Sequence, residues 1–246
     1  MKNLFVIGDI HGDFEMMKEV LKKWEKEKQQ LLFLGDLNDR GPQSKSCFLL
    51  AKSLVEGDKA IYLMGNHEIM FLNYLESPND DPDLFLENGG KETVESFLYK
   101  GVLNELSNTE IAMMIRTIYK DLIRFLSERP LYAEWGQYVF VHAGVDLKNK
   151  DWRKSTARDF LWSRKHFIEG KNRTGKTIVF GHTPTVYLNH GVVNPDVWQE
   201  DGKIGVDGGA VYGYVLYGVE FSKDGIEHIN EVQHKNWKEY LAKRKQ

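Results

Sequence analysis

Residues 31–41, LLFLGDLNDRG, join a short apolar run to a cluster of polar residues. The run at residues 31–34 has the length of a buried strand, and Gly35 ends it. Asp36 and Arg40 follow within a few residues. In α/β sheets, ligand sites lie just beyond the carboxyl ends of the strands. This stretch therefore predicts a buried strand that delivers a carboxylate to a functional site.

Four other apolar runs, at residues 4–7, 60–64, 138–141 and 177–180, are also followed by residues that can bind a metal. We expect five strands that bring these residues to one edge of a sheet. The expected metal ligands are Asp9, His11, Asp36, Asn66, His142 and His182. Oxygen and imidazole donors without thiolate suit Mn, Fe, Zn, Ni or Co better than Ca or an all-oxygen Mg site. The pattern predicts a two-metal hydrolytic centre.

The expected ligands divide between two ions. Asp9 and His11 are two residues apart, so on an extended strand end their side chains would point the same way and reach one ion. Asp36 has two carboxylate oxygens and can bridge to a second ion. Two metals about 3.5–4 Å apart clamp the attacking and leaving oxygens at phosphorus, and they lower the pKa of bound water from about 15.7 towards about 7.

Length and composition fit one globular domain, residues 1–246, because a single core grows to roughly 250–300 residues before it splits. The net charge of -3 gives no reason to expect nucleic acid as a partner. No run approaches the roughly 18 apolar residues of a membrane span, so no membrane partner is expected. Cys47 is the only cysteine and is expected in the core on a helix face; its isolation suits a cytoplasmic protein.

Helical patterns separate the predicted strands. Apolar residues spaced three and four apart from Phe14 to Trp24, and again from Cys47 to Val55, predict two helices between the first three strands, which is the pattern of an α/β fold. Residues 69–130 show no strand pattern and predict a helical insert, either a lid or wall over the cleft or a packing layer. Strands return at 131–133, 204–206 and 215–221, and residues 236–245 predict a short basic helix or a frayed tail.

The ordered motifs GDIHG, GDLNDRG, GNHE, HAG and GHT resemble those of the calcineurin-like metallophosphoesterases. More narrowly they resemble the phosphoprotein phosphatase family of serine/threonine phosphatases, in its bacterial and phage form. The resemblance runs from Asp9 to about Gly213. It implies a β-sandwich of two mixed sheets flanked by helices, whereas the pattern of elements alone suggests a doubly wound parallel sheet.

The resemblance also implies roles for individual residues. Asp9, His11 and Asp36 would hold the first metal, and Asp36, Asn66, His142 and His182 the second, with Mn favoured. His67 matches the proton donor to the leaving group, Asp39 the carboxylate that orients it, and Arg40 and Arg164 the phosphate-binding arginines. Asp207 matches a residue at the rim of the site. Asn38 replaces a small apolar residue of many relatives, and residues 88–90 with Thr93 resemble a bacterial segment whose role stays open.

The expected function is a dinuclear-metal-dependent serine/threonine protein phosphatase that uses a metal-bound hydroxide for in-line attack. Asp39 and Glu68 favour it, because related symmetrical diadenosine tetraphosphate hydrolases usually lack that aspartate and carry aspartate in place of that glutamate. Such a dinucleotide hydrolase, or a broad small-molecule phosphomonoesterase, is the alternative. A nuclease lacks a supporting basic face. A binding module without activity would be expected to lose a ligand or His67, and the sequence retains them all.

Overall fold

The computed structural model describes residues 2–188 and 194–235, so the predicted tail at residues 236–245 lies outside the described residues. The strands are β1 (Asn3–Ile7), β2 (Gln29–Phe33), β3 (Ile61–Tyr62), β4 (Tyr132–Trp135), β5 (Tyr138–Val141), β6 (Thr177–Phe180), β7 (Trp198–Glu200), β8 (Lys203–Gly205), β9 (Val215–Phe221) and β10 (Ile226–Gln233). The α-helices are α1 (Phe14–Leu21), α2 (Ser44–Asp58), α3 (Asn66–Glu76), α4 (Pro82–Phe85), α5 (Lys91–Phe97), α6 (Asn108–Ile118), α7 (Lys120–Ser127), α8 (Ala157–Trp162) and α9 (Lys165–Ile168).

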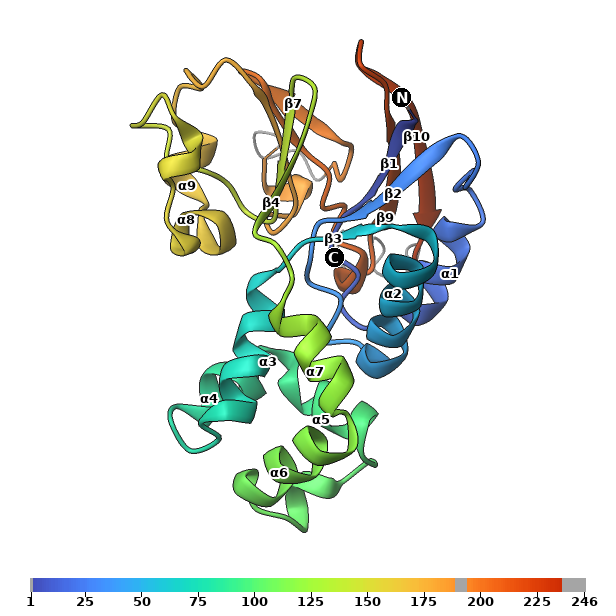
Figure 1. Ribbon diagram of the computed structural model, residues 1–246, viewed down its shortest axis with the longest axis vertical. Coiled ribbons are helices and arrows are strands. Elements are labelled where there is room, and N and C mark those ends of the chain that lie inside the picture. The colour runs from blue at the N-terminus through green and yellow to red at the C-terminus, as the bar shows by residue number, and fades with distance from the viewer. Residues whose placement is uncertain (1, 189–193, 236–246) are drawn as a thin grey trace, which may run out of the picture.

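Two mixed sheets of five strands form the centre of the fold (Figure 1). The first has the order β10-β9-β1-β2-β3. In it β1, β2 and β3 are parallel, β9 is antiparallel to β1, and β10 is antiparallel to β9. The second has the order β4-β5-β6-β8-β7, in which β5, β6 and β8 are parallel. The sandwich of two mixed sheets is therefore confirmed, and the doubly wound sheet that the element pattern suggested is wrong.

Both faces of the central strands are buried, which explains their continuous apolar runs. On β1, Phe5 and Ile7 belong to the apolar cluster shared with the helices, whereas Leu4 and Val6 belong to the cluster between the sheets. The second sheet repeats this alternation, because Phe140 faces the inter-sheet cluster and Val141 faces the outer one. Helices α8 and α9 cover that outer face through Phe160 and Phe167.

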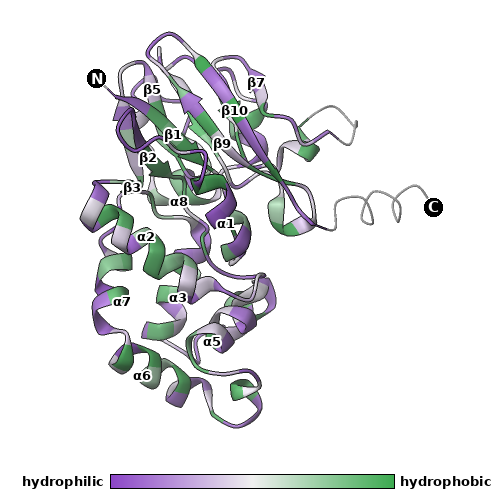
Figure 2. Cartoon of the chain, turned by 90° about the vertical axis from the view of Figure 1, so that its right-hand side faces the viewer, coloured by the Kyte–Doolittle hydropathy of each residue, from purple (hydrophilic) through white to green (hydrophobic). Residues whose placement is uncertain are grey.

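The helical insert packs on the first sheet, and its residues Gly89 and Thr93 also contact the predicted site residues Arg40 and Asp39. Helices α3 to α7 fill the chain between β3 and β4 and lie at the foot of the molecule in Figures 1 and 2. Phe71, Phe85 and Phe97 pack ring against ring there, with centroids 5.7 Å (Phe71–Phe85) and 5.1 Å (Phe71–Phe97) apart. These rings belong to the same buried cluster as Phe5 and Phe33 of the first sheet. The insert and the first sheet therefore share one core.

Several predicted boundaries were wrong by one to three residues, including those of β2, β3, β4 and β8, and the sequence prediction missed β7 and β10. β10 is an edge strand with mostly exposed or half-exposed residues, so it carries no apolar run.

Cys47 is buried on α2 as predicted. No helix among residues 2–188 and 194–235 has the length and apolar character needed to cross a membrane. A single domain and a cytoplasmic location stay predictions.

Candidate metal centre

The polar residues that follow the strands meet where the two sheets come together. Asp9 and Asp36 follow β1 and β2 of the first sheet, and Asn66 begins α3 just after β3. His142 and His182 follow β5 and β6 of the second sheet. The expectation of one edge of one sheet was wrong, because both sheets contribute. The backbone N–H of His182 joins them by donating to both carboxylate oxygens of Asp9, at 3.0 and 3.1 Å.

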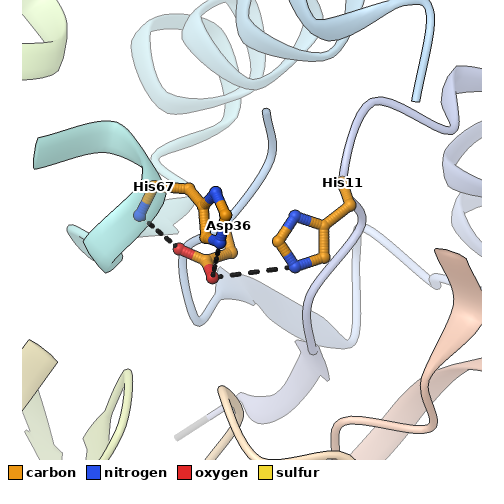
Figure 3. A group of neighbouring side chains, drawn as sticks. All are labelled: His11, Asp36 and His67. Carbon is orange, nitrogen blue, oxygen red and sulfur yellow. Dashed lines mark hydrogen bonds and ion pairs between the residues drawn. The ribbon is translucent and has the colours of Figure 1, made fainter. Parts of the chain in front are cut away.

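The first group of side chains surrounds one oxygen of Asp36. His11 Nε2 lies 3.7 Å from Asp36 Oδ2 and 3.9 Å from Asp9 Oδ2. His67 Nε2 approaches the same Asp36 oxygen at 3.9 Å (Figure 3). All four side chains are buried. Their donor atoms could hold a metal ion, and one atom each from His11, Asp36 and His67 lies within 4.8 Å of the others.

The second group shares the same carboxylate. His142 Nε2 lies 3.4 Å from Asp36 Oδ2, 2.9 Å from Asn66 Oδ1 and 3.2 Å from His182 Nδ1. Asp36, His142 and His182 also offer ligand atoms within 4.8 Å of one another. Asp36 therefore belongs to both groups, but they approach the same oxygen, Oδ2, and not one oxygen each as the sequence suggested.

The chemistry of the donors fits a cation. The Nδ1 atoms of His11 and His142 lie 2.9 Å and 3.0 Å from backbone carbonyl oxygens, of Asn38 and Leu34, so each can donate a proton there. When the ring is neutral, that tautomer directs the Nε2 lone pair into the site. His182 Nε2 is buried without a hydrogen-bond partner in the described part of the chain. Acceptor atoms thus converge with few hydrogens between them, which is the arrangement that a metal ion satisfies.

Burial and neighbouring charges together set the charge states of these groups. Burial lowers the pKa of His142, but the Asp36 carboxylate outweighs burial and raises that pKa to about 9, so a metal ion would have to replace a proton on its Nε2. Burial and the charge of Asp207 raise the pKa of Asp9, and burial raises the pKa of Asp207 to about 6. Burial also raises the pKa of Asp36, but the neighbouring histidines, His142 first, outweigh it and hold that pKa well below its usual range. Burial and His142 lower the pKa of His182 to about 2, so its ring is neutral and able to act as a ligand near neutral pH.

The backbone of the site is strained. Of the eight non-glycine residues with positive φ in the described part of the chain, five are predicted site residues: His11, Asp36, Asp39, Arg40 and His182. The expectation that His11 lies on an extended strand end was therefore wrong, because its φ is 51°. Such conformations cost roughly 1–3 kcal/mol each and persist only where surrounding contacts impose them. They aim side chains from tight loops at one point.

Glu68 is one such surrounding contact. Its buried carboxylate accepts hydrogen bonds from the backbone N–H groups of Asp36 (2.9 Å), Leu37 (2.7 Å) and Gly65 (2.9 Å) and from the Tyr62 hydroxyl (2.8 Å). It therefore ties the loop after β2 to the start of α3. The sequence interpretation used Glu68 only to choose between relatives and missed this role. Its place three residues after Gly65, the position that closes a capping box, was the available signal.

The predicted catalytic residues Asp39, Arg40 and His67 also come together. His67 Nδ1 lies 2.6 Å from Asp39 Oδ2, and both side chains are buried. The Arg40 guanidinium lies against His11 Nε2 at 2.6 Å and His67 Nε2 at 2.9 Å. It also packs over the ring of Tyr212, 5.4 Å from the centroid, a neighbour that the sequence interpretation missed.

Arg164 lies on the opposite side of the site and is exposed. Its Nη1 donates to the backbone carbonyl of His182 at 2.9 Å and to the Thr183 hydroxyl at 3.3 Å. A groove of about 890 Å³ begins there, and Arg158, Trp162 and Lys165 contribute to its lining. Arg164 therefore lies between the predicted ligand His182 and an open, positively charged groove.

Asn38 and Asp207 also have definite contacts, and Asn38 lies beside the Asp39–His67 pair, which we call the dyad. The Asn38 amide donates to Asp39 Oδ1 at 2.8 Å and to the His67 carbonyl at 3.1 Å. Its departure from the family pattern thus adds contacts to the dyad. Asp207 is buried, close enough for its charge to act on Asp9, and Oδ1 accepts the Gly209 N–H at 2.9 Å.

Comparison with known families and proteins gives a consistent result. The family model described as calcineurin-like phosphoesterase matches residues 2–219. Serine/threonine-protein phosphatase 1 of Salmonella typhimurium is 30% identical over 189 residues, which cover 74% of this chain and 79% of that protein. The asymmetrical bis(5'-nucleosyl)-tetraphosphatase PrpE of Geobacillus sp. is 29% identical over 237 residues, covering 86% of this chain and 87% of that protein.

Two further proteins are similar to this chain only over part of their length or only in fold. The symmetrical bis(5'-nucleosyl)-tetraphosphatase of Vibrio parahaemolyticus is 27% identical over 200 residues, 80% of this chain but only 60% of the length of that protein. The structure of a protein serine/threonine phosphatase from Saccharomyces cerevisiae has a TM-score of 0.58 at 16% identity, over 94% of this chain and 80% of that chain. At this identity the structural likeness concerns the fold alone.

Proposed function

This chain belongs to the calcineurin-like phosphoesterase family, and from that membership we propose that it is a metal-dependent phosphoester hydrolase with a dinuclear centre. The observation that carries the proposal is the position of Asp36. Its buried Oδ2 lies 3.7 Å from His11 Nε2 of the first group and 3.4 Å from His142 Nε2 of the second. A carboxylate that serves two groups of ligands is suited to holding two cations side by side.

Asp9, His11 and Asp36 would hold one cation, and Asp36, Asn66, His142 and His182 the other. The imidazole-rich donor set favours Mn, Fe, Zn, Ni or Co, and Mn is our first choice. When bound, the cations polarise the phosphoryl group and make a coordinated water more acidic.

The arginines bind the phosphoryl oxygens in this proposal. A guanidinium offers a planar fork of donors that matches two phosphoryl oxygens. Arg40 holds its fork over the site, where it contacts His11 and His67 at 2.6 and 2.9 Å. Arg164 faces it from the side of His182. A cation held by His11 Nε2 would take the place of the first contact, and substrate would exchange the second, with His67, for contacts with phosphate.

His67 donates a proton to the leaving oxygen as the bond from phosphorus to that oxygen breaks. Its Nδ1–H donates to Asp39 Oδ2 at 2.6 Å, so Nε2 is the atom that faces the substrate. Nε2 also contacts Arg40 at 2.9 Å. Since a guanidinium only donates, His67 can carry a proton on Nε2 only after Arg40 has moved onto the phosphoryl group. Binding of phosphate would therefore prepare the proton donor.

Phosphoserine and phosphothreonine in proteins are the first choice of substrate. The groove beside Arg164 has a volume of about 890 Å³ and carries Arg158, Arg164 and Lys165. This is room and positive charge for the remainder of a phosphorylated peptide. The 30% identity with serine/threonine-protein phosphatase 1 of Salmonella typhimurium supports the same choice.

A dinucleotide polyphosphate is the second candidate, alongside small phosphomonoesters. The 29% identity with the Geobacillus asymmetrical tetraphosphatase extends over most of both chains. Trp162 and Tyr212 are 40% and 37% exposed, and Tyr212 lies over Arg40. Exposed aromatic rings beside phosphate-binding arginines could stack on nucleobases.

A parallel assay tests the proposal. The protein with Mn²⁺ is offered p-nitrophenyl phosphate, a phosphoserine peptide and diadenosine tetraphosphate. We expect turnover of the first two, loss of both activities in Asp36→Asn, and loss of the phosphopeptide activity in His67→Asn. Efficient turnover of the dinucleotide alone would replace the protein-phosphatase assignment by the second candidate. Undiminished activity in Asp36→Asn would overturn the assignment of the centre.

A further inference from the structure

Two of the predicted catalytic residues, Asp39 and Arg40, have strained backbones. Asp39 and Arg40 are consecutive, and their φ values are 68° and 67°. A non-glycine residue in the left-handed region costs roughly 1–3 kcal/mol, and two in succession need contacts that hold them. Those contacts come largely from the helical insert, which lies about fifty residues further along the chain.

Thr93 on α5 holds Asp39 from two directions. The Asp39 N–H donates to Thr93 Oγ1 at 2.9 Å, and the same hydroxyl donates to Asp39 Oδ1 at 2.6 Å. Thr93 and Asp39 are both fully buried, so water does not replace these bonds. Ser44 supports the pair, because its hydroxyl accepts the Asp39 N–H at 3.1 Å and lies 2.9 Å from Thr93 Oγ1.

Gly89 holds Arg40 in a similar way. Its carbonyl accepts the Arg40 N–H at 3.0 Å. Gly89 has a φ of 100°, and a Cβ there would lie 2.3 Å from Arg40 N, so only glycine allows this approach. The insert therefore meets the loop after β2 at both strained residues.

These contacts fix the plane of the Asp39 carboxylate. Thr93 and the Asn38 amide both donate to Oδ1, at 2.6 and 2.8 Å. Oδ2 is then directed at His67 Nδ1, 2.6 Å away. A hydroxyl at residue 93 acts on His67 through one intervening carboxylate, and its hydrogen bonds among the described residues go to Asp39 and Ser44, neither of which is a predicted metal ligand.

We propose that Thr93 is a positioning residue for the proton donor: its hydroxyl orients Asp39, and Asp39 orients His67 towards the leaving oxygen. This inference rests on the proposed role of His67. The insert then has two roles: through Thr93 it holds the carboxylate that orients the proton donor, and it contributes side chains to the hydrophobic core.

The leaving group supplies a readout that a merely structural role would not move. A nitrophenolate leaves readily as the anion, whereas the serine alkoxide of a phosphopeptide is strongly basic and needs a proton as it leaves. Weaker positioning of His67 therefore affects the phosphopeptide and spares p-nitrophenyl phosphate. A general loss of fold, metal or phosphate binding would lower both rates together.

The experiment compares Thr93→Val, Thr93→Ser and Thr117→Val in the full-length protein with Mn²⁺. Thr117 lies on α6 of the same insert, is exposed, and donates only to the Met113 carbonyl, so it is the matched control. We expect Thr93→Val to lower kcat for a phosphoserine peptide by roughly 10- to 100-fold, a part of what general acid catalysis supplies, and kcat for p-nitrophenyl phosphate by less than about threefold. Thr93→Ser keeps the hydroxyl and should retain most of the peptide activity.

Two results would overturn the inference: equal losses on both substrates in Thr93→Val, or no recovery in Thr93→Ser. His67→Asn separates this failure from failure of the proposed function. If His67→Asn shows no selective loss on the peptide, the role of His67 is wrong and the inference falls with it. If His67→Asn shows that loss and Thr93→Val does not, only the inference is wrong. Should Thr93→Val not fold, Thr93→Ala makes the same comparison.

Discussion

The two sides of the site are built in opposite ways. The side formed by the loops after β2 and β3 is buried, and Asp39 and Glu68 are each 0% exposed and held by several hydrogen bonds. The side formed by α8 and the residues after it is open, and Trp162 is 40% exposed. We call these the closed side and the open side. The difference suggests that the closed side determines the chemistry and the open side selects the substrate.

The most severe test of the closed side is Asp36→Asn. The amide keeps the shape but removes the negative charge that both groups of ligands share. Loss of several kcal/mol of transition-state stabilisation should lower kcat/KM by about a thousandfold or more. Steady-state kinetics and the metal content of the purified protein measure the effect. The exposed Asp121→Asn is the control, and unchanged metal content in Asp36→Asn would contradict the bridging role.

Glu68→Gln tests whether the closed side is held by its buried network. A glutamine amide can accept at one oxygen only, so some of the donors on Asp36, Leu37 and Gly65 lose their partner. Each unsatisfied buried donor costs about 1–3 kcal/mol, and we expect the free energy of unfolding to fall by about 2–4 kcal/mol, with at least a tenfold loss of kcat.

Urea unfolding measures that change. The control is Glu110→Gln, where a capping glutamate makes comparable bonds to Ser107 on the exposed surface. Little change in the control and a large change in Glu68→Gln would support the contrast between buried and exposed networks. Equal changes in both variants would refute it.

The two arginines allow a direct comparison across the site. Arg40 is half-buried against His11 and His67, and Arg164 is exposed. We expect Arg40→Ala to lower kcat by about a hundredfold and Arg164→Ala to act mainly on KM, by about tenfold, because the exposed group binds ground state and transition state alike. Kinetics with p-nitrophenyl phosphate distinguish the two, and a larger kcat effect for Arg164 would reverse the comparison.

The smallest effect is expected on the open side. Arg158→Glu reverses a charge in the groove without touching the centre. KM for a phosphopeptide with acidic flanking residues should rise by roughly three- to tenfold, and the rise should shrink as salt screens the charges. Turnover of p-nitrophenyl phosphate should not change. A rise that is the same for peptides with acidic and neutral flanks would contradict electrostatic selection by the groove.

Sequence patterns predicted the parts of this molecule that depend on local chemistry. Central strands such as β5 and β6 were predicted because both of their faces are buried and the apolar run is continuous. The residues after them were predicted because strand ends converge in such sheets. The division of the strands between two sheets came from the family resemblance, since run length alone does not tell which strands pair.

Other contacts could not be predicted because they join distant residues without a periodic signal. Thr93 lies on a helix whose pattern indicates only core and surface, yet its hydroxyl bonds to Asp39, 54 residues earlier. Tyr212 reaches Arg40 from near the other end of the chain. β10 was missed for a different reason. It lies at a sheet edge with exposed or half-exposed residues, so its sequence has no apolar run that would indicate a strand.

The bond from the His182 N–H to the Asp9 carboxylate spans 173 positions of the chain, and that from His142 Nδ1 to the Leu34 carbonyl spans 108. During synthesis, a nascent chain that ends before residue 182 holds the first half of the centre without its partner. Contacts of such high sequence separation form late, because the chain entropy of closing long loops opposes them. The second group of ligands is thus complete only once residue 182 has been made, whereas Asp9, His11 and Asp36 of the first group all lie near the start of the chain.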